Sequence, residues 1–210
     1  MTSFPNSPKL TRGAIVSVDR MNPLASIIIF QYNPETMKRT LTPQRMETPQ
    51  NHRDEQRLTG PPREAITMSV DIDATDQLET ASFPATKLGL HPVLAALEML
   101  LYPKSAFVIN NEILAKIGMT EVIPPSSPMT LLVWGIKRVV PIRLTSFSID
   151  EQHYDTHLNP IQAKVDLGMD VLNYNDLGLI SAGGGIFMAH QVVKEAMAVL
   201  GSVRGALSSL

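Results

Sequence analysis

The residues whose types and spacing come closest to a reactive site lie in residues 144–172. Glu151, His153, Asp155 and His157 alternate there, so an extended chain would place them on one face. Carboxylates and imidazoles are ligands that zinc accepts, but a zinc site needs three or four of them at about 2 Å, oriented by further partners. The sequence around these four shows no such partners. A helix would also bring His153 and His157 together, but the segment has no apolar helical period and joins two strands. We therefore predict a solvated turn, with no metal or other cofactor.

Other candidates for catalysis are weaker. The densest acidic cluster is Asp71, Asp73, Asp76 and Glu79, and its first two members fall on the polar face of a predicted strand. The glycine-rich segment of residues 181–187 lacks the Lys-Ser/Thr pair of a P-loop, which favours a flexible linker before a terminal helix. We predict that the chain is not an enzyme. The alternative from another class is a small-molecule-binding β-barrel or a hydrolase that uses Asp71, Asp73 and His153.

Composition limits the classes of partner. The chain has 210 residues, a formal net charge of −2 and scattered basic residues, which argues against nucleic-acid binding. It contains 0 cysteines, which suits a reducing compartment. The first 12 residues lack the apolar core of a secretory signal, and residues 186–203 are interrupted by charges, so we expect no direct membrane insertion.

A β-hairpin is the strongest structural signal. One arm alternates between apolar and polar residues: Ile161, Ala163, Val165, Leu167, Met169 and Val171 against Gln162, Lys164, Asp166 and Asp170. In the other arm, strict alternation puts Ile142 and Leu144 on one face with Ser146 and Ser148, and Phe147 and Ile149 on the opposite face. Residues 150–160 between the arms are expected to be a polar loop.

About seven strands and one internal helix follow from the remaining pattern. Strands are predicted near residues 13–18, 25–32, 36–42, 64–73, 129–135 and 137–144, in addition to the hairpin. In residues 64–73, Ile66, Met68, Val70 and Ile72 share one face. A helix is predicted over residues 91–102, residues 107–120 fit helix or strand, and residues 43–62 are expected to form a long polar loop.

Three motifs occur in a fixed order along the chain. They are FQYNPETMKRTLTP, then LLVWG, then the hairpin RLTSFSIDEQHYDTHLNPIQAKVDLGMDVL. Together they resemble the tube-type proteins of contractile injection systems, the phage-tail-like particles, over about residues 27–172. The matching positions are Phe30, Tyr32, Asn33, Pro34, Trp134, Gly135, Tyr154, Asp155, Pro160 and Ala163.

The resemblance implies a mainly β fold: a tail-tube-like (Hcp-like) antiparallel β-barrel with one flanking α-helix. It also implies a homo-oligomer, a hexameric ring that contacts inner-tube, spike or hub, and baseplate proteins in a particle assembled in the cytoplasm and released from the cell. The chain departs from the family at Leu158 and Asn159, where Gly is frequent, and at Gln162, where Arg is frequent. It also lacks the LysM domain of many relatives, so no role of that Arg or of LysM is transferred.

The C-terminal part lies outside the resemblance. We divide the chain into a tube-like domain, residues 1–178, and a linker with an amphipathic helix, residues 179–210. Apolar residues recur at helical spacing, and we expect Val193, Met197 and Leu200 among them to form an interface. The full stripe is Ile186, Ala189, Val193, Ala196, Met197, Leu200, Val203 and Leu207. Its partner is either the same subunit or a neighbour.

These features predict a structural subunit that forms a ring at the junction between inner tube and baseplate, as a tube initiator or adaptor. The alternative within the same particle is the stacked major inner-tube protein. The long loop at residues 43–62 and the terminal helix favour the junction, because a repeated ring needs fewer accessory segments.

Overall fold

Seven antiparallel strands form one sheet in the computed structural model, which describes residues 11–19, 22–45, 58–81, 83–102, 105–116 and 128–208. The strands are β1 (Ala14–Asp19), β2 (Asn22–Ile29), β3 (Met37–Thr42), β4 (Arg63–Asp73), β5 (Met129–Val133), β6 (Val139–Tyr154) and β7 (Pro160–Val171). Their spatial order is β2-β1-β5-β6-β7-β4-β3. The predicted mainly β fold and the strand count are therefore confirmed.

Six helices accompany the sheet in the described part. They are α1 (Thr75–Glu79), α2 (Ala85–Leu88), α3 (His91–Glu98), α4 (Ser105–Lys116), α5 (Tyr174–Leu177) and α6 (Ala182–Ser208). The predicted internal helix is α3, and the ambiguous segment at residues 107–120 contributes the helix α4. The expectation of one internal helix was too low, because the short helices α1, α2 and α5 form as well. Most of the predicted loop at residues 43–62 and the N-terminal residues 1–10 lie outside the described residues.

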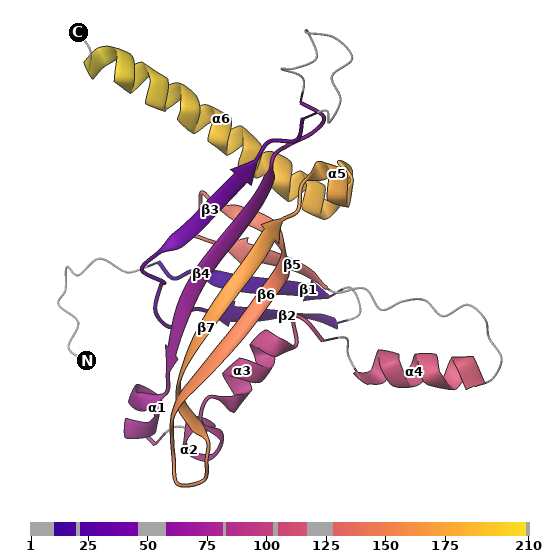
Figure 1. Ribbon diagram of the computed structural model, residues 1–210, viewed down its shortest axis with the longest axis vertical. Coiled ribbons are helices and arrows are strands. Elements are labelled where there is room, and N and C mark those ends of the chain that lie inside the picture. Colours follow the sequence, from indigo (N-terminus) through magenta and orange to yellow (C-terminus); the bar gives the residue numbers. More distant parts are fainter. Residues whose placement is uncertain are drawn as a thin grey trace.

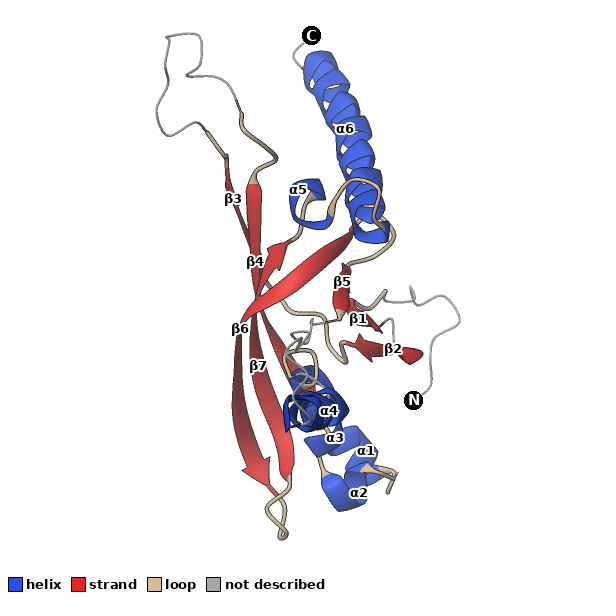
Figure 2. Ribbon diagram, turned by 90° about the vertical axis from the view of Figure 1, so that its right-hand side faces the viewer, coloured by secondary structure: helices blue, strands red, loops and turns tan. Residues whose placement is uncertain are grey.

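The sheet bends into two layers that share β6. Strands β3, β4, β6 and β7 run along the longest axis, whereas β1, β2 and β5 cross them (Figure 1). The first residues of β6 pair with β5, and its remainder pairs with β7 as far as Tyr154. Helices α1, α2 and α3 lie on the same side of the long strands as β1 and β2 (Figure 2).

The core lies between these layers. As predicted, Ile66, Met68, Val70 and Ile72 of β4 are buried, and so are Ala163, Val165, Leu167, Met169 and Val171 of β7. Leu94 and Leu97 of α3 join the same cluster. The two-residue period of the strands thus identified the buried face of both central strands.

The assignment of faces in β6 was wrong. The pairing register shifts between Leu144 and Ser146, so Phe147 lies opposite Leu167 and Ile149 opposite Val165. Both side chains consequently pack on the core face together with Leu144. The irregularity sits beside Gly168, where an added Cβ would lie 2.1 Å from the Ser146 Oγ. A β-bulge at this point therefore places Phe147 and Ile149 on the core face, whereas strict alternation would have placed them on the opposite face.

The predicted linker before the last helix is also wrong. Helix α6 begins at Ala182, and its glycines Gly183 and Gly184 are buried. A Cβ on Gly183 would lie 2.6 Å from the Leu177 Cδ1, and one on Gly184 would lie 2.2 Å from the Gly178 carbonyl oxygen. The two glycines allow the first turn of α6 to pack closely against Leu177 and Gly178. This packing fixes the position at which α6 begins.

The sheet ends at β2 and β3. Among the described residues no ladder joins these two strands, so the sheet is open there. The antiparallel sheet is observed, whereas the tube-type barrel that the resemblance implies stays a prediction.

Two neighbouring substitutions test the face assignment of β7. Val165 is fully buried and Lys164 is exposed. Val165→Asn buries an amide among aliphatic side chains, and we expect it to lower the free energy of unfolding by about 3 kcal/mol. Lys164→Asn should change it by about 0.5 kcal/mol or less. Denaturant unfolding of both variants checks this, and similar losses would show that the faces are inverted.

Candidate functional site

The tip of the β6–β7 hairpin is a rigid turn organised by Asp155. Its Oδ1 accepts hydrogen bonds from the backbone N–H groups of His157 at 2.7 Å and Asn159 at 2.8 Å. Its Oδ2 accepts one from the Asn159 Nδ2 at 2.8 Å. These bonds, with the Asn159 side chain contributing most, hold the pKa of Asp155 below its ordinary value. The turn is shorter than predicted, because β6 continues to Tyr154 and β7 begins at Pro160.

The same turn is joined to the helical side of the molecule. The Pro160 carbonyl accepts a hydrogen bond from the Leu90 N–H at 2.9 Å, and the Asn159 Nδ2 also lies 3.4 Å from the Lys87 carbonyl oxygen. Gly89 approaches so closely that a Cβ there would lie 2.5 Å from the Pro160 oxygen. The hairpin is thus braced by the chain just before α3.

The four alternating residues considered for zinc do not converge. His153 has a positive φ of 53°, Glu151 accepts a hydrogen bond from the Tyr154 hydroxyl at 3.3 Å, and both oxygens of Asp155 bind the turn. Across the described ranges, no three His, Asp or Glu side chains are grouped so that they could hold a metal ion. The absence of a metal-dependent function stays a prediction.

The other two motifs meet at a corner of the sheet. Phe30 is buried and its ring centroid lies 6.5 Å from that of Trp134. Gly13 makes room for the pair, because a Cβ there would lie 2.7 Å from the Trp134 ring. The Asn33 Oδ1 accepts a hydrogen bond from the Gly13 N–H at 2.9 Å, which ties the end of β2 to the start of β1. These motif residues therefore have structural roles.

The remaining predicted residues lie apart from this corner. Gly135 has a φ of 69° in the turn from β5 to β6, and Ala163 and Pro160 are buried in β7. Tyr32 and Tyr154 are exposed, and Pro34 is partly buried. The structure thus brings together Phe30, Asn33 and Trp134, and separates them from the hairpin tip.

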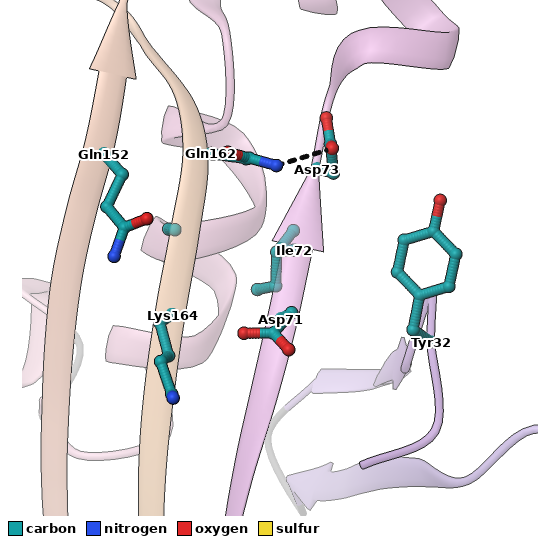
Figure 3. Close-up of a pocket in the computed structure, with 8 residues that line it drawn as sticks. Tyr32, Asp71, Ile72, Asp73, Gln152, Gln162 and Lys164 are labelled. Atoms are coloured by element: carbon teal, nitrogen blue, oxygen red, sulfur yellow. Dashed lines mark hydrogen bonds between the residues drawn. The ribbon is translucent and has the colours of Figure 1, made fainter. Parts of the chain in front are cut away.

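A polar hollow of about 450 Å³ lies over β4 and β7 (Figure 3). It is lined by Tyr32, Asp71, Ile72, Asp73, Gln152, Gln162, Ala163 and Lys164. The Gln162 Nε2 donates to the Asp73 Oδ2 at 2.9 Å, and the Thr75 N–H donates to its Oδ1 at 2.7 Å. Burial raises the pKa of Asp73, but the hydrogen bonds from Thr75 and Gln162 outweigh it, and the pKa is lowered.

The chemistry of this hollow is limited. A carboxyl group whose pKa is lowered is ionised at neutral pH, which disfavours a role as proton donor. His153, the third residue of the hydrolase hypothesis, is not among the residues that line the hollow, and the described lining includes no serine or threonine nucleophile. The hollow offers hydrogen-bonding groups and two carboxylates, which suits solvation or weak polar contacts.

A charged site that was not predicted from the sequence anchors α6 to the sheet. Glu64 of β4 is only 7% exposed. It accepts a hydrogen bond from the Arg39 Nε at 2.7 Å and lies 3.2 Å from the Lys194 Nζ. The sequence did indicate that Glu64 is buried, because it lies two residues before the buried Ile66 and therefore on the same face of β4. Burial raises the pKa of Glu64, but Arg39 and Lys194 outweigh that effect and lower it.

His190 of α6 belongs to the same junction. It is buried, and its Nδ1 lies 3.2 Å from the Lys137 carbonyl oxygen. Burial, reinforced by the charge of Lys194, lowers the pKa of His190. Phe187, one helical turn earlier, is buried and contacts Tyr174 edge-on. The first half of α6 therefore docks on its own subunit.

The second half of α6 projects away from the body (Figure 1). Every residue from Glu195 to Ser202 is exposed, and Leu200 is 70% exposed. Val193 and Met197 are exposed as well. Residues 195–208 extend about 20 Å at helical rise. The predicted interface residues Val193, Met197 and Leu200 thus lie on an exposed apolar stripe of this subunit.

Comparison with protein-family models and with curated proteins yields no match for this chain. Within the described residues, the helices lack the combination of length and apolar character needed to cross a membrane.

The anchor of α6 can be tested through Glu64. Glu64→Gln leaves Arg39 and Lys194 without their counter-charge, and we expect the free energy of unfolding at neutral pH to fall by about 2 kcal/mol. Because the folded pKa is lowered, the stabilising effect is complete above the unfolded value near 4.5 and is lost as the pH falls through the lower folded value. Unfolding curves of both proteins across acidic pH should therefore converge. A constant difference down to the lowest pH would contradict the ionic role.

Proposed function

We propose that this chain is a structural subunit of a contractile injection particle, forming a ring at the junction between the inner tube and the baseplate as a tube initiator or adaptor. The observation that carries the proposal is the distal half of α6. It is an apolar helical segment that continues from the docked first half, and its residues from Glu195 to Ser202 are exposed within the described part of the subunit. Helices with apolar residues on most sides are normally buried, so this one needs a neighbour.

The open sheet supports the ring. Strand β2 lies at one edge and exposes Ile27 and Ile29, and β3 lies at the other edge. Exposed strand edges carry unpaired backbone groups and favour pairing with another chain. In a closed ring, β2 of one subunit meets β3 of the next, which removes both edges at every contact. Six copies per ring is what the resemblance implies.

The partners follow from this placement. The ring would contact inner-tube protein on one side and spike, hub or baseplate proteins on the other, and the particle would assemble in the cytoplasm before release. None of these roles requires catalysis. The polar hollow and its carboxylates would then be part of a solvated or lumen-facing surface.

The stacked major inner-tube protein remains the second candidate. It is favoured by an uneven distribution of charge. Asp150, Glu151 and Asp155 outnumber the nearby Lys87 and Lys164 at the hairpin end, and Lys137, Arg138 and Lys194 outnumber Glu64 near the docked half of α6. Stacked rings bring such opposite ends together.

A truncation distinguishes the docking of α6 on its own subunit from the incorporation of the subunit into particles. Deleting Ile186 to Leu210 would remove Phe187 from the core and Lys194 from Glu64, so it would destabilise the subunit itself. Deleting residues 196–210 instead should leave the melting temperature nearly unchanged while preventing incorporation into particles. Electron microscopy and immunodetection of purified particles provide the measurement.

A matched pair of substitutions serves as the control. Leu200→Asp places a charge on the apolar stripe, whereas Ser202→Asp places it on the opposite side of the same helix. We expect the first variant to be excluded from particles and the second to be incorporated. Normal incorporation of both the truncated chain and Leu200→Asp would remove the support for a junction role.

A further inference from the structure

We propose that the hairpin tip of one copy docks into an apolar hollow beside α6 of a second copy, so that copies associate head to tail. This contact is distinct from the lateral pairing of strand edges. It goes beyond the proposed function, because it is a property of the purified chain and does not depend on any injection particle.

The hollow has a volume of about 280 Å³ and lies between α6 and the turn from β5 to β6. Its apolar lining comprises Ile136, Val139, Ile186, Ala189 and Val193. Ile136 is 98% exposed at the rim. Met197 and Leu200 follow Val193 on the same helical face, so the apolar surface continues along the projecting part of α6. An aliphatic side chain would occupy part of the hollow and contact its apolar lining.

The hairpin tip presents such a side chain. Leu158 is 76% exposed and has a φ of 63°, a conformation that is rare for a bulky residue. Its N–H donates to the Asp155 carbonyl at 3.1 Å, and Asp155 holds the residues on both sides of it. Leu158 is therefore fixed in an exposed position before any contact forms, which lowers the entropic cost of docking.

A copy cannot fill its own hollow. Residues 139 and 154 mark the two ends of β6, and Val139 lines the hollow while Tyr154 borders the tip. Fifteen residue steps of strand separate them, roughly 50 Å along the chain. Figures 1 and 2 likewise place the hairpin tip at one end of the longest axis and α6 in the other half of the molecule. A hairpin tip that enters the hollow therefore belongs to another molecule.

Charge identifies that molecule as a second copy. The hairpin tip carries Asp150, Glu151 and Asp155, and α1 at the same end adds Asp76 and Glu79, against nearby Lys87 and Lys164. The rim of the hollow carries Lys137, and Lys194, Arg138 and Glu64 lie close to His190, which also lines it. Glu64 is paired with Lys194, so Lys137 and Arg138 leave this region with an excess of positive charge. Glu195 falls on the side of α6 away from Val193. An acidic tip with an aliphatic residue at its apex complements a basic rim around an apolar hollow.

The contact uses two different surfaces, so it is heterologous. Each added copy leaves one free tip and one free hollow, and association continues unless another surface stops it. A ring of such subunits would therefore present one acidic face and one basic face along its axis.

Cysteine cross-linking tests the contact directly, because the chain contains 0 cysteines. Leu158→Cys is mixed with a size-tagged Val193→Cys protein and oxidised, and the disulfide-linked heterodimer is followed on non-reducing gels. Val199→Cys replaces Val193→Cys in the control, since both positions are exposed but residue 199 faces away from the hollow. We expect the Val193 pair to form about tenfold faster than the Val199 pair.

Exchanging the charges of Glu151 and Lys137 provides a second test of the contact. Adding Glu151→Lys to the Leu158→Cys protein should slow the cross-link, and adding Lys137→Glu to the Val193→Cys protein should restore it. All variants are first checked for unchanged thermal melting and normal reactivity of the thiol with a small reagent. Equal rates for residues 193 and 199, no cross-link with reactive thiols, or no rescue by the charge exchange would each overturn the proposal. The purified chain gives this answer whether or not it enters a particle.

Discussion

The buried carboxylate of Glu64 is the constraint on which the direction of α6 depends. A charge at 7% exposure is costly unless it is paired, and Glu64 meets Arg39 of β3 and Lys194 of α6 at the same point. The edge strand, its neighbour in the sheet and the terminal helix are thereby fixed to one another. Below this point, Gly183 and Gly184 hold the first turn of α6 against the chain before it. Everything proposed for the projecting half of the helix relies on these two attachments.

Strand β6 provides the second constraint, because it belongs to both layers of the sheet. Its start pairs with β5 beside the foot of α6, and its end carries the hairpin tip. The bulge after Leu144 turns Phe147 and Ile149 toward the core, so the strand continues to pack apolar side chains against the core as far as Ile149. Packing along the strand restrains the hairpin tip relative to the start of β6. The tip and the α6 hollow are therefore held at a nearly fixed separation.

The parts of the fold that follow from local pattern were predictable from sequence. The buried faces of β4 and β7 and the helix α3 depend on period and on proline position, which the sequence displays directly. The bulge was not predictable, since it depends on Gly168 of the partner strand approaching Ser146. The joint at Gly183 was mistaken for a linker, because glycine runs serve flexibility and close packing alike. Of the candidate surfaces, the apolar stripe of α6 was predicted, whereas Glu64 was overlooked although its parity placed it among buried residues.

The proposed lateral and axial contacts would draw on different chemistry, and this difference has a consequence for assembly. Pairing of strand edges would use backbone groups, which are insensitive to salt and are satisfied once a ring closes. Docking of the hairpin tip would use one aliphatic side chain surrounded by complementary charges, whose attraction weakens as ionic strength rises. Rings would therefore survive conditions that separate stacks. A subunit built in this way can complete its own ring first and then offer a directional surface to the next layer, so the order of assembly follows from the relative strength of the two contacts.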